Sequence, residues 1–352
     1  MKLSRIACGS MKKVFFALLV VTLLVPCCLP ARDWTKDPPW FEIPSVERVG
    51  VVGDVHAAFD QFAASLKCLG FAERTATGAF TLRWTGEAAT LIFTGDFTDR
   101  GKYTKECYDA VMDLEIQAKK AGGRVIPLLG NHEILLLNGT VEKWANTLTS
   151  DKKQNYMNTL ESFKNGGCDF HQAISPEGVY GSWIRRRPLF AIVNGFLFIH
   201  GGLAKSAPTR SELAADYRDV IDAEKLSDGF LMDEFGPLWI RDWWLNKDQV
   251  DTCLQKLGVR GVIFGHTVGA LGKKGNINTL DNRLVGIDIG MTPAYGNSQG
   301  GGLLITIEPA GDMQFTAMYP DRPSVALFKT AGPVTPPETS RKKTPQSIPH
   351  NH

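Results

Sequence analysis

Acidic, histidine and asparagine side chains recur directly after short apolar runs in this chain. The residues that follow five such runs are Asp54 and His56, Asp96, Asn131 and His132, His200, and His266. A short apolar run that ends in glycine and a polar residue predicts a buried strand whose carboxyl end delivers that side chain to a ligand site. One such end is ordinary turn chemistry, but five in the same register predict a shared site.

The five segments form an ordered set of motifs: GDVH (53–56), GDFTDRG (95–101), GNHE (130–133), HGG (200–202) and GHT (265–267). Over residues 48–318 the set resembles the PPP-family metallophosphatases, which are calcineurin-like phosphoesterases. Segments 236–241 and 286–291 resemble the bacterial-type branch, which includes Shewanella-like and ApaH-like phosphatases. The resemblance implies an α/β fold: a two-sheet β-sandwich flanked by helices, with a helical cap insertion.

The resemblance also implies a dinuclear metal site. Asp54, His56 and Asp96 would hold one ion, with Asp96 bridging, and Asn131, His200 and His266 would complete the other. Carboxylate, imidazole and amide donors favour manganese, iron or zinc. Two ions about 3.5–4 Å apart neutralise phosphate oxygens and lower the pKa of a bridging water from about 15.7 toward 7. We therefore expect a phosphomonoester hydrolase, similar to a protein phosphatase, that uses a bridging hydroxide.

Three further motif residues suit the remaining catalytic steps. Arg100 presents a planar fork that matches two phosphate oxygens. His132 follows a ligand and should stand beside the metals without binding them. Asp99 is placed to orient His132, which predicts that His132 acts as the general acid for the leaving alkoxide.

Two residues outside the five motifs have two interpretations each. Arg241 resembles a second phosphate-binding arginine of the bacterial-type branch, or it stacks among Trp239, Trp243 and Trp244. Asp288 is either an acid on a loop near the site or a turn former.

Local patterns predict the elements that position these residues. Asn194-Gly195 between two apolar runs predicts a tight hairpin that leads to His200. Residues 134–187 show no strand pattern and predict a helical cap insertion over the site, which would select substrates. Three later segments read as strands of the second sheet: 284–289, 302–308 and 314–318.

Composition and charge leave the substrate open. The 352 residues, 43% apolar and 22% charged, are typical of a folded chain, and we expect one metallophosphoesterase domain over residues 32–329. A net charge of +2 gives no reason to expect a nucleic-acid partner.

The substrate would be a phosphorylated protein or small phosphoester. The alternative is a diadenosine polyphosphate or nucleotide hydrolase, in which residues 185–187, all arginine, either grip polyphosphate or face solvent. An inactive binding module would have lost a ligand, and all motifs are intact.

The two ends of the chain predict processing and disorder. Lys12 and Lys13 precede an apolar run at 14–25, which is typical of a secretory signal over residues 1–31 with an alternative start at Met11. We expect export to the periplasm or medium, with membrane attachment only through the leader or through a lipid on Cys27 or Cys28. Residues 330–352 read as a disordered tail. No disulfide pairing and no oligomeric state follow from the sequence.

Overall fold

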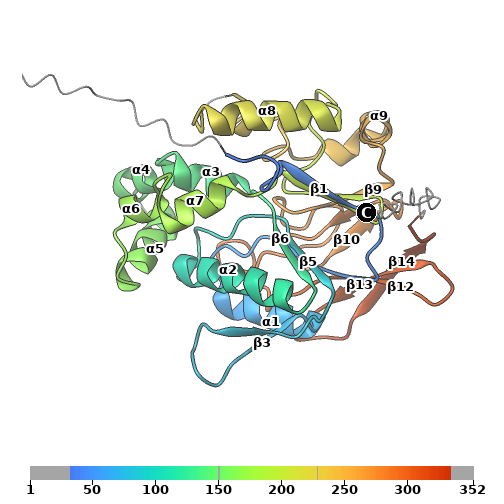
Figure 1. Cartoon of the computed structure of the whole chain (residues 1–352), viewed down its shortest axis with the longest axis horizontal. Coiled ribbons are helices and arrows are strands. Elements are labelled where there is room, and N and C mark those ends of the chain that lie inside the picture. Colours follow the sequence, from blue (N-terminus) through green and yellow to red (C-terminus); the bar gives the residue numbers. More distant parts are fainter. Residues whose placement is uncertain (1–31, 150, 228, 334–352) are drawn as a thin grey trace, which may run out of the picture. The chain divides into compact units, whose positions relative to one another are not determined.

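The computed structural model describes residues 32–149, 151–227 and 229–333. Within them the chain forms two six-stranded sheets, one two-stranded sheet, and helices on both sides of the sheets (Figure 1). The predicted α/β fold, a two-sheet sandwich flanked by helices, is confirmed.

The first sheet carries three of the predicted strand ends. Its order is β14-β13-β12-β2-β5-β6. The strands are β2 (Arg48–Val52), β5 (Thr90–Phe93), β6 (Arg124–Pro127), β12 (Gly302–Ile307), β13 (Met313–Met318) and β14 (Val325–Thr330). Strands β2, β5 and β6 run parallel and are largely buried, which explains why their sequences are continuous apolar runs. Because they are parallel, their carboxyl ends meet at one edge.

The second sheet carries the other two strand ends. Its order is β1-β7-β8-β9-β11-β10. The strands are β1 (Trp40–Ile43), β7 (Phe190–Val193), β8 (Phe196–Ile199), β9 (Gly261–Phe264), β10 (Asn278–Leu280) and β11 (Leu284–Gly286). Strands β8, β9 and β11 are parallel, so His200 and His266 follow neighbouring parallel strands. The small third sheet pairs β3 (Ala72–Arg74) with β4 (Leu82–Trp84).

Aromatic side chains join the two large sheets. The ring of Phe196 on β8 lies 5.0 Å from that of Phe315 on β13, and Phe315 stacks on Phe328 of β14 at 4.2 Å. All three side chains are buried. Burying one such side chain stabilises the fold by about 1.5–3 kcal/mol, so this contact holds the sheets together.

Helices cover the outer faces of the sandwich. Figure 1 shows α1 (Phe59–Leu69) and α2 (Thr104–Lys120) on one side, and α8 (Arg210–Asp222) and α9 (Lys247–Leu257) on the other. In α1 the buried Phe59, Phe62, Leu66 and Leu69 follow helical spacing, and the Phe62 ring lies 5.6 Å from Phe93 of β5. Short 3-10 helices η1 (Gly229–Leu231) and η2 (Trp243–Leu245) lie in the connections.

The chain between β6 and β7 is helical. Its elements are α3 (Asn131–Leu137), α4 (Thr140–Thr147), α5 (Asp151–Asn165), α6 (Phe170–Ile174) and α7 (Val179–Arg185). Helix α5 packs on α2 and α4. Figure 1 shows these helices gathered beside the sheets, next to α2.

The grouping of the late strands differs from the prediction. Strand β11 pairs with β9 in the second sheet, as expected, whereas β12 pairs with β2 and β13 pairs with β12 in the first sheet. Strand pairing depends on partners far away in the sequence, so the local pattern that identified these strands could not assign their sheet. Strand β14 ends at Thr330, one residue into the predicted tail.

The predicted leader at 1–31 and nearly all of the predicted tail, 334–352, lie outside the described residues. Export and lipid attachment therefore stay predictions. In the part of the chain that is described, no helix combines the length and apolarity needed to cross a membrane. The four described cysteines are free thiols: Cys68, Cys107, Cys168 and Cys253.

The predicted hairpin at Asn194-Gly195 joins β7 and β8. Both residues have positive φ, 54° and 79°, as a tight I′ turn requires. The Asn194 side chain is buried and bonds the backbone of Val46 twice, accepting from its N–H at 2.7 Å and donating to its carbonyl at 2.8 Å. The turn thus also anchors the segment between β1 and β2.

We expect Asn194→Ala to lower the free energy of unfolding by about 2 kcal/mol, because two buried backbone groups of Val46 lose their partner. Chemical denaturation measures this. Asn282 also has positive φ, 53°, but its side chain is exposed, so Asn282→Ala is the matched control and should cost less than about 1 kcal/mol. Equal losses would mean that only the backbone conformation matters.

Candidate metal centre

The five predicted strand ends converge where the edges of the two sheets meet. Strands β2, β5 and β6 lead to Asp54, Asp96 and Asn131, and strands β8 and β9 lead to His200 and His266. All of these side chains are buried, as is His56. His56, Asp96 and His266 have left-handed backbone conformations, with φ of 46°, 54° and 63°. Such conformations are costly outside glycine and cluster at functional sites.

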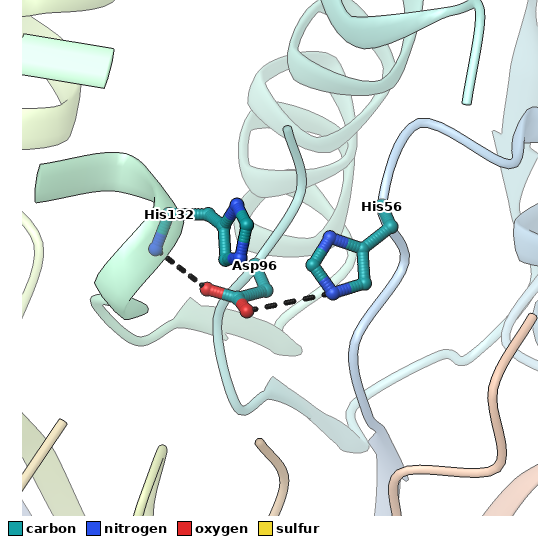
Figure 2. Close-up of side chains that lie close together, drawn as sticks. All are labelled: His56, Asp96 and His132. Carbon is teal, nitrogen blue, oxygen red and sulfur yellow. Dashed lines mark hydrogen bonds and ion pairs between the residues drawn. The ribbon is translucent and has the colours of Figure 1, made fainter. Parts of the chain in front are cut away.

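Asp96 lies at the centre of this cluster. Its Oδ2 is 3.6 Å from Nε2 of His56, and its Oδ1 is 3.4 Å from Nε2 of His200. Oδ1 also accepts from the backbone N–H of His132 at 3.0 Å. Figure 2 shows the Asp96 carboxylate between His56 and His132.

Two groups of possible metal ligands share Asp96. One consists of His56, Asp96 and His132, and the other of Asp96, His200 and His266; in each, the donor atoms lie within 4.8 Å of one another. Asn131 Oδ1 is 2.7 Å from Nε2 of His200. The structure thus brings five of the six predicted ligands together, and it also places His132, expected only beside the metals, among the donors. Asp54 is in neither group; its Oδ2 accepts from the backbone N–H of His266 at 2.9 Å.

The hydrogen bonds of the histidines suit metal binding. Nδ1 of His56 bonds the carbonyl of Thr98 at 3.0 Å, and Nδ1 of His200 bonds the carbonyl of Thr94 at 2.8 Å. A carbonyl can only accept, so Nδ1 carries the hydrogen and Nε2 turns its lone pair toward Asp96. Burial lowers the pKa of both histidines, which keeps them in the neutral form that binds metals.

The carboxylates create a need for positive charge. Burial raises the pKa of Asp54, and repulsion from Asp288 and Asp96 raises it further. Burial likewise raises the pKa of Asp96, with repulsion from Glu133 adding to the rise. Deprotonated carboxylates this close together and this buried are strongly destabilising unless cations compensate them. The donor set therefore fits metal ions.

Two motif glycines allow the carboxylates to lie where they do. A Cβ on Gly130 would overlap Oδ1 of Asp96, and a Cβ on Gly265 would overlap Oδ1 of Asp54. These are the glycines of GNHE and GHT. They are required for close approach, since neither has a positive φ.

Glu133 is a site residue that the sequence analysis did not single out. Its Oε1 accepts from Phe97 N–H and Tyr108 O–H, and its Oε2 accepts from the N–H groups of Asp96 and Gly130. The buried carboxylate therefore ties the Asp96 loop to the GNHE loop. Its position three residues after Gly130, where a helix N-terminus favours glutamate, was the available signal.

Asp99 and His132 form a buried pair. Oδ2 of Asp99 is 2.7 Å from Nδ1 of His132, and Oδ1 accepts from Thr159 Oγ1 at 2.9 Å. Burial raises the pKa of Asp99 to about 7, and burial together with the charges of Arg100 and Arg241 lowers the pKa of His132. Since Nδ1 faces Asp99, Nε2 is the ring nitrogen of His132 that can exchange a proton with a substrate.

The site opens into a cleft of about 310 Å³, within the range of small-molecule sites. Its lining residues are His56, Asp96, His132, Arg241, His266, Thr267, Val268, Asp288 and Tyr295. Arg241 donates from Nη1 to the carbonyl of His266 at 2.7 Å and to Thr267 Oγ1 at 3.1 Å. These contacts place Arg241 at the cleft and favour that interpretation over stacking among the tryptophans.

Asp288 satisfies both of its sequence interpretations, since it lines the cleft and also accepts from the N–H of Gly290 at 3.0 Å. Burial raises its pKa to about 6. Arg100 is not among the residues that line the cleft, but its Nε donates to the hydroxyl of Tyr295, which does line it, at 2.9 Å.

The geometry agrees with a comparison of the whole chain with known families. Residues 47–270 match the family described as calcineurin-like phosphoesterase. The chain belongs to this family. The calcineurin-like phosphoesterase is thus a hydrolytic enzyme, and the family implies divalent metal cofactors and a phosphorylated substrate. The resemblance to PPP metallophosphatases is confirmed, and the inactive binding module is set aside.

Several proteins are similar in sequence to this calcineurin-like phosphoesterase. An uncharacterised protein of Schizosaccharomyces pombe is 27% identical over 267 residues, which cover 70% of this chain and 74% of that protein. Shewanella-like protein phosphatase 2 of Arabidopsis thaliana is 25% identical over 299 residues, 72% of this chain and 73% of that protein. Shewanella-like protein phosphatase 1 of Plasmodium berghei is 33% identical over 124 residues, which cover 34% of this chain and 31% of that protein.

Solved structures share the fold. The cold-active protein-tyrosine phosphatase of a psychrophilic Shewanella species superposes with a TM-score of 0.64 at 22% identity, covering 83% of this chain and 82% of that chain. A protein serine/threonine phosphatase from Saccharomyces cerevisiae gives a TM-score of 0.50 at 20% identity, covering 87% of each chain.

We expect Glu133→Gln to lower the free energy of unfolding by about 3 kcal/mol, because an amide NH₂ would face two buried donors that lose their acceptor. Denaturation measures the loss, and metal analysis should show weaker metal retention as the Asp96 loop loosens. Glu161→Gln, on the exposed face of α5, is the control and should change neither. A stable Glu133→Gln variant with full metal content would show that the carboxylate does not hold the two loops.

Proposed function

We propose that this calcineurin-like phosphoesterase is a phosphomonoesterase with two metal ions. Asp54, His56 and Asp96 would hold one ion, and Asp96, Asn131, His200 and His266 would hold the other. The observation that carries the proposal is the position of Asp96, whose two carboxylate oxygens each lie close to a different histidine. A carboxylate shared in this way suits a bridging ligand.

The chain's own residues have distinct roles in this reaction. When bound, manganese, iron or zinc ions would neutralise phosphate oxygens and lower the pKa of a bound water. Arg100 and Arg241 bind the phosphate oxygens through their guanidinium groups. His132, oriented by Asp99, gives the proton from Nε2 to the departing alkoxide.

Phosphoproteins or small phosphoesters are the substrates we favour. Residues 185–187, which the polyphosphate alternative requires at the substrate, bind other side chains instead. Arg187 pairs with Glu115 at 2.7 Å, Arg185 with Glu224 at 2.8 Å, and Nη1 of Arg186 donates to Ser182 Oγ at 2.8 Å. The similar proteins named as protein phosphatases support the same choice. Diadenosine polyphosphate hydrolysis is the alternative that a substrate panel would reveal.

Asp96→Asn should abolish turnover and reduce bound metal, because the shared ligand loses its charge while the hydrogen bond from His132 N–H remains. The measurements are metal content and hydrolysis of phosphoserine, phosphothreonine and phosphotyrosine peptides beside diadenosine tetraphosphate. Asp216→Asn, an exposed position on α8, is the matched control. Normal metal content and rate in the Asp96 variant would rule out the two-metal proposal.

His132→Asn should slow hydrolysis of phosphoserine-like substrates by on the order of 10²–10⁴, since an alkoxide needs a proton to leave. p-Nitrophenyl phosphate has a better leaving group, so its hydrolysis should slow much less. Asp99→Asn should show the same pattern with smaller decreases in rate. The exposed His171 provides the control His171→Asn. Equal losses on both substrates, or loss of metal, would make His132 a ligand or scaffold residue instead.

A further inference from the structure

We infer that Tyr156 and Tyr295 are positioning residues that hold the guanidinium of Arg100 for phosphate binding. Tyr156 lies on α5 between β6 and β7, and Tyr295 lies on the loop after β11. The inference rests on the proposed phosphate-binding role of Arg100. It assigns part of the active site to helix α5.

Helix α5 first holds the backbone that carries Arg100. Asp99 and Arg100 both have left-handed conformations, with φ of 68° and 70°, which the surrounding structure must stabilise. Arg100 N–H donates to the carbonyl of Asn155 at 2.8 Å, and the Arg100 carbonyl accepts from Asn158 Nδ2 at 3.0 Å. Both peptide groups that flank this residue are therefore bonded to α5.

One face of α5 carries polar residues that lie against the loop with Asp99 and Arg100 and against the start of α2. Asn155, Asn158, Thr159 and Ser162 follow the spacing of a single helix face. Thr159 donates to Asp99, and Ser162 Oγ accepts from Lys105 N–H at 2.9 Å. The Asn158, Thr159 and Ser162 side chains are all buried; Asn158 and Thr159 find their partners on the Asp99–Arg100 loop, and Ser162 finds its partners in the first turn of α2.

The two tyrosines then hold the side chain of Arg100. The guanidinium carbon lies 4.9 Å from the ring centre of Tyr156 and 5.3 Å from that of Tyr295. Both distances suit a cation–π contact. Nε also donates to the Tyr295 hydroxyl at 2.9 Å, so both tyrosines contact the guanidinium that we propose binds phosphate.

Tyr295 connects this arrangement to the reacting centre. It lines the cleft, and its ring centre lies 5.1 Å from that of His56. A guanidinium that is fixed before substrate arrives loses less conformational entropy on binding. Removing either contact should therefore weaken phosphate binding more than it slows the bond-breaking step.

The experiment is a double-mutant cycle in the full-length, metal-loaded enzyme. Tyr295→Phe removes one hydroxyl, and we expect it to raise KM for phosphotyrosine peptide on the order of tenfold, with a matching rise in the inhibition constant of inorganic phosphate and a small change in kcat. Tyr156→Leu should raise KM several-fold, and Tyr156→Phe, which keeps the ring, should restore it. In an Arg100→Lys background both tyrosine effects should largely vanish.

Tyr180→Phe is the matched control, because Tyr180 lies on α7, and its buried hydroxyl group donates to Asp109 at 2.7 Å. It should leave KM unchanged, and thermal melting of every variant separates stability from binding. Tyrosine effects that persist fully in the Arg100→Lys background, or that appear only as lower melting temperature, would overturn the inference but leave the proposed function intact. An Arg100→Lys enzyme with unchanged KM would instead overturn the phosphate-binding role of Arg100, and this inference with it.

Discussion

The burial of acidic side chains at the meeting edge of two sheets is the constraint on which the site depends. Asp54 and Asp96 are almost inaccessible to solvent and lie near Asp288. Taking a carboxylate out of water costs several kcal/mol, and a second charge of the same sign adds to the cost. Backbone donors reduce it, since His266 N–H bonds Asp54 and His132 N–H bonds Asp96. The remaining charge needs cations, which explains why neutral histidines surround the acids.

The same constraint accounts for motif residues that do not face the cleft. Gly130 and Gly265 leave room for the carboxylates of Asp96 and Asp54. Glu133 is a further buried acid: burial raises the pKa of its carboxyl, and the four hydrogen bonds that it accepts oppose that rise. It can therefore serve as a rigid link between two loops while the carboxylates beside it remain available to cations.

The helices between β6 and β7 contribute contacts to the residues of the site. Helix α5 contacts Asp99 through Thr159 and the backbone of Arg100 through Asn155 and Asn158. The acid pair and the proposed phosphate-binding arginine are thus both supported from α5.

The sequence by itself determined the features that depend on neighbouring residues. Apolar runs identified the strands, Asn194-Gly195 identified the hairpin, and the motifs placed metal-type donors at five strand ends and identified the family. Only the tertiary structure decided which sheet receives β12 and β13, that Arg241 reaches the cleft, and that residues 185–187 do not. It also showed the contacts of Glu133, Tyr156 and Tyr295. The physical reason is that these properties depend on hydrogen bonds and ring contacts between segments far apart in the chain, and no local pattern of residues encodes such partners.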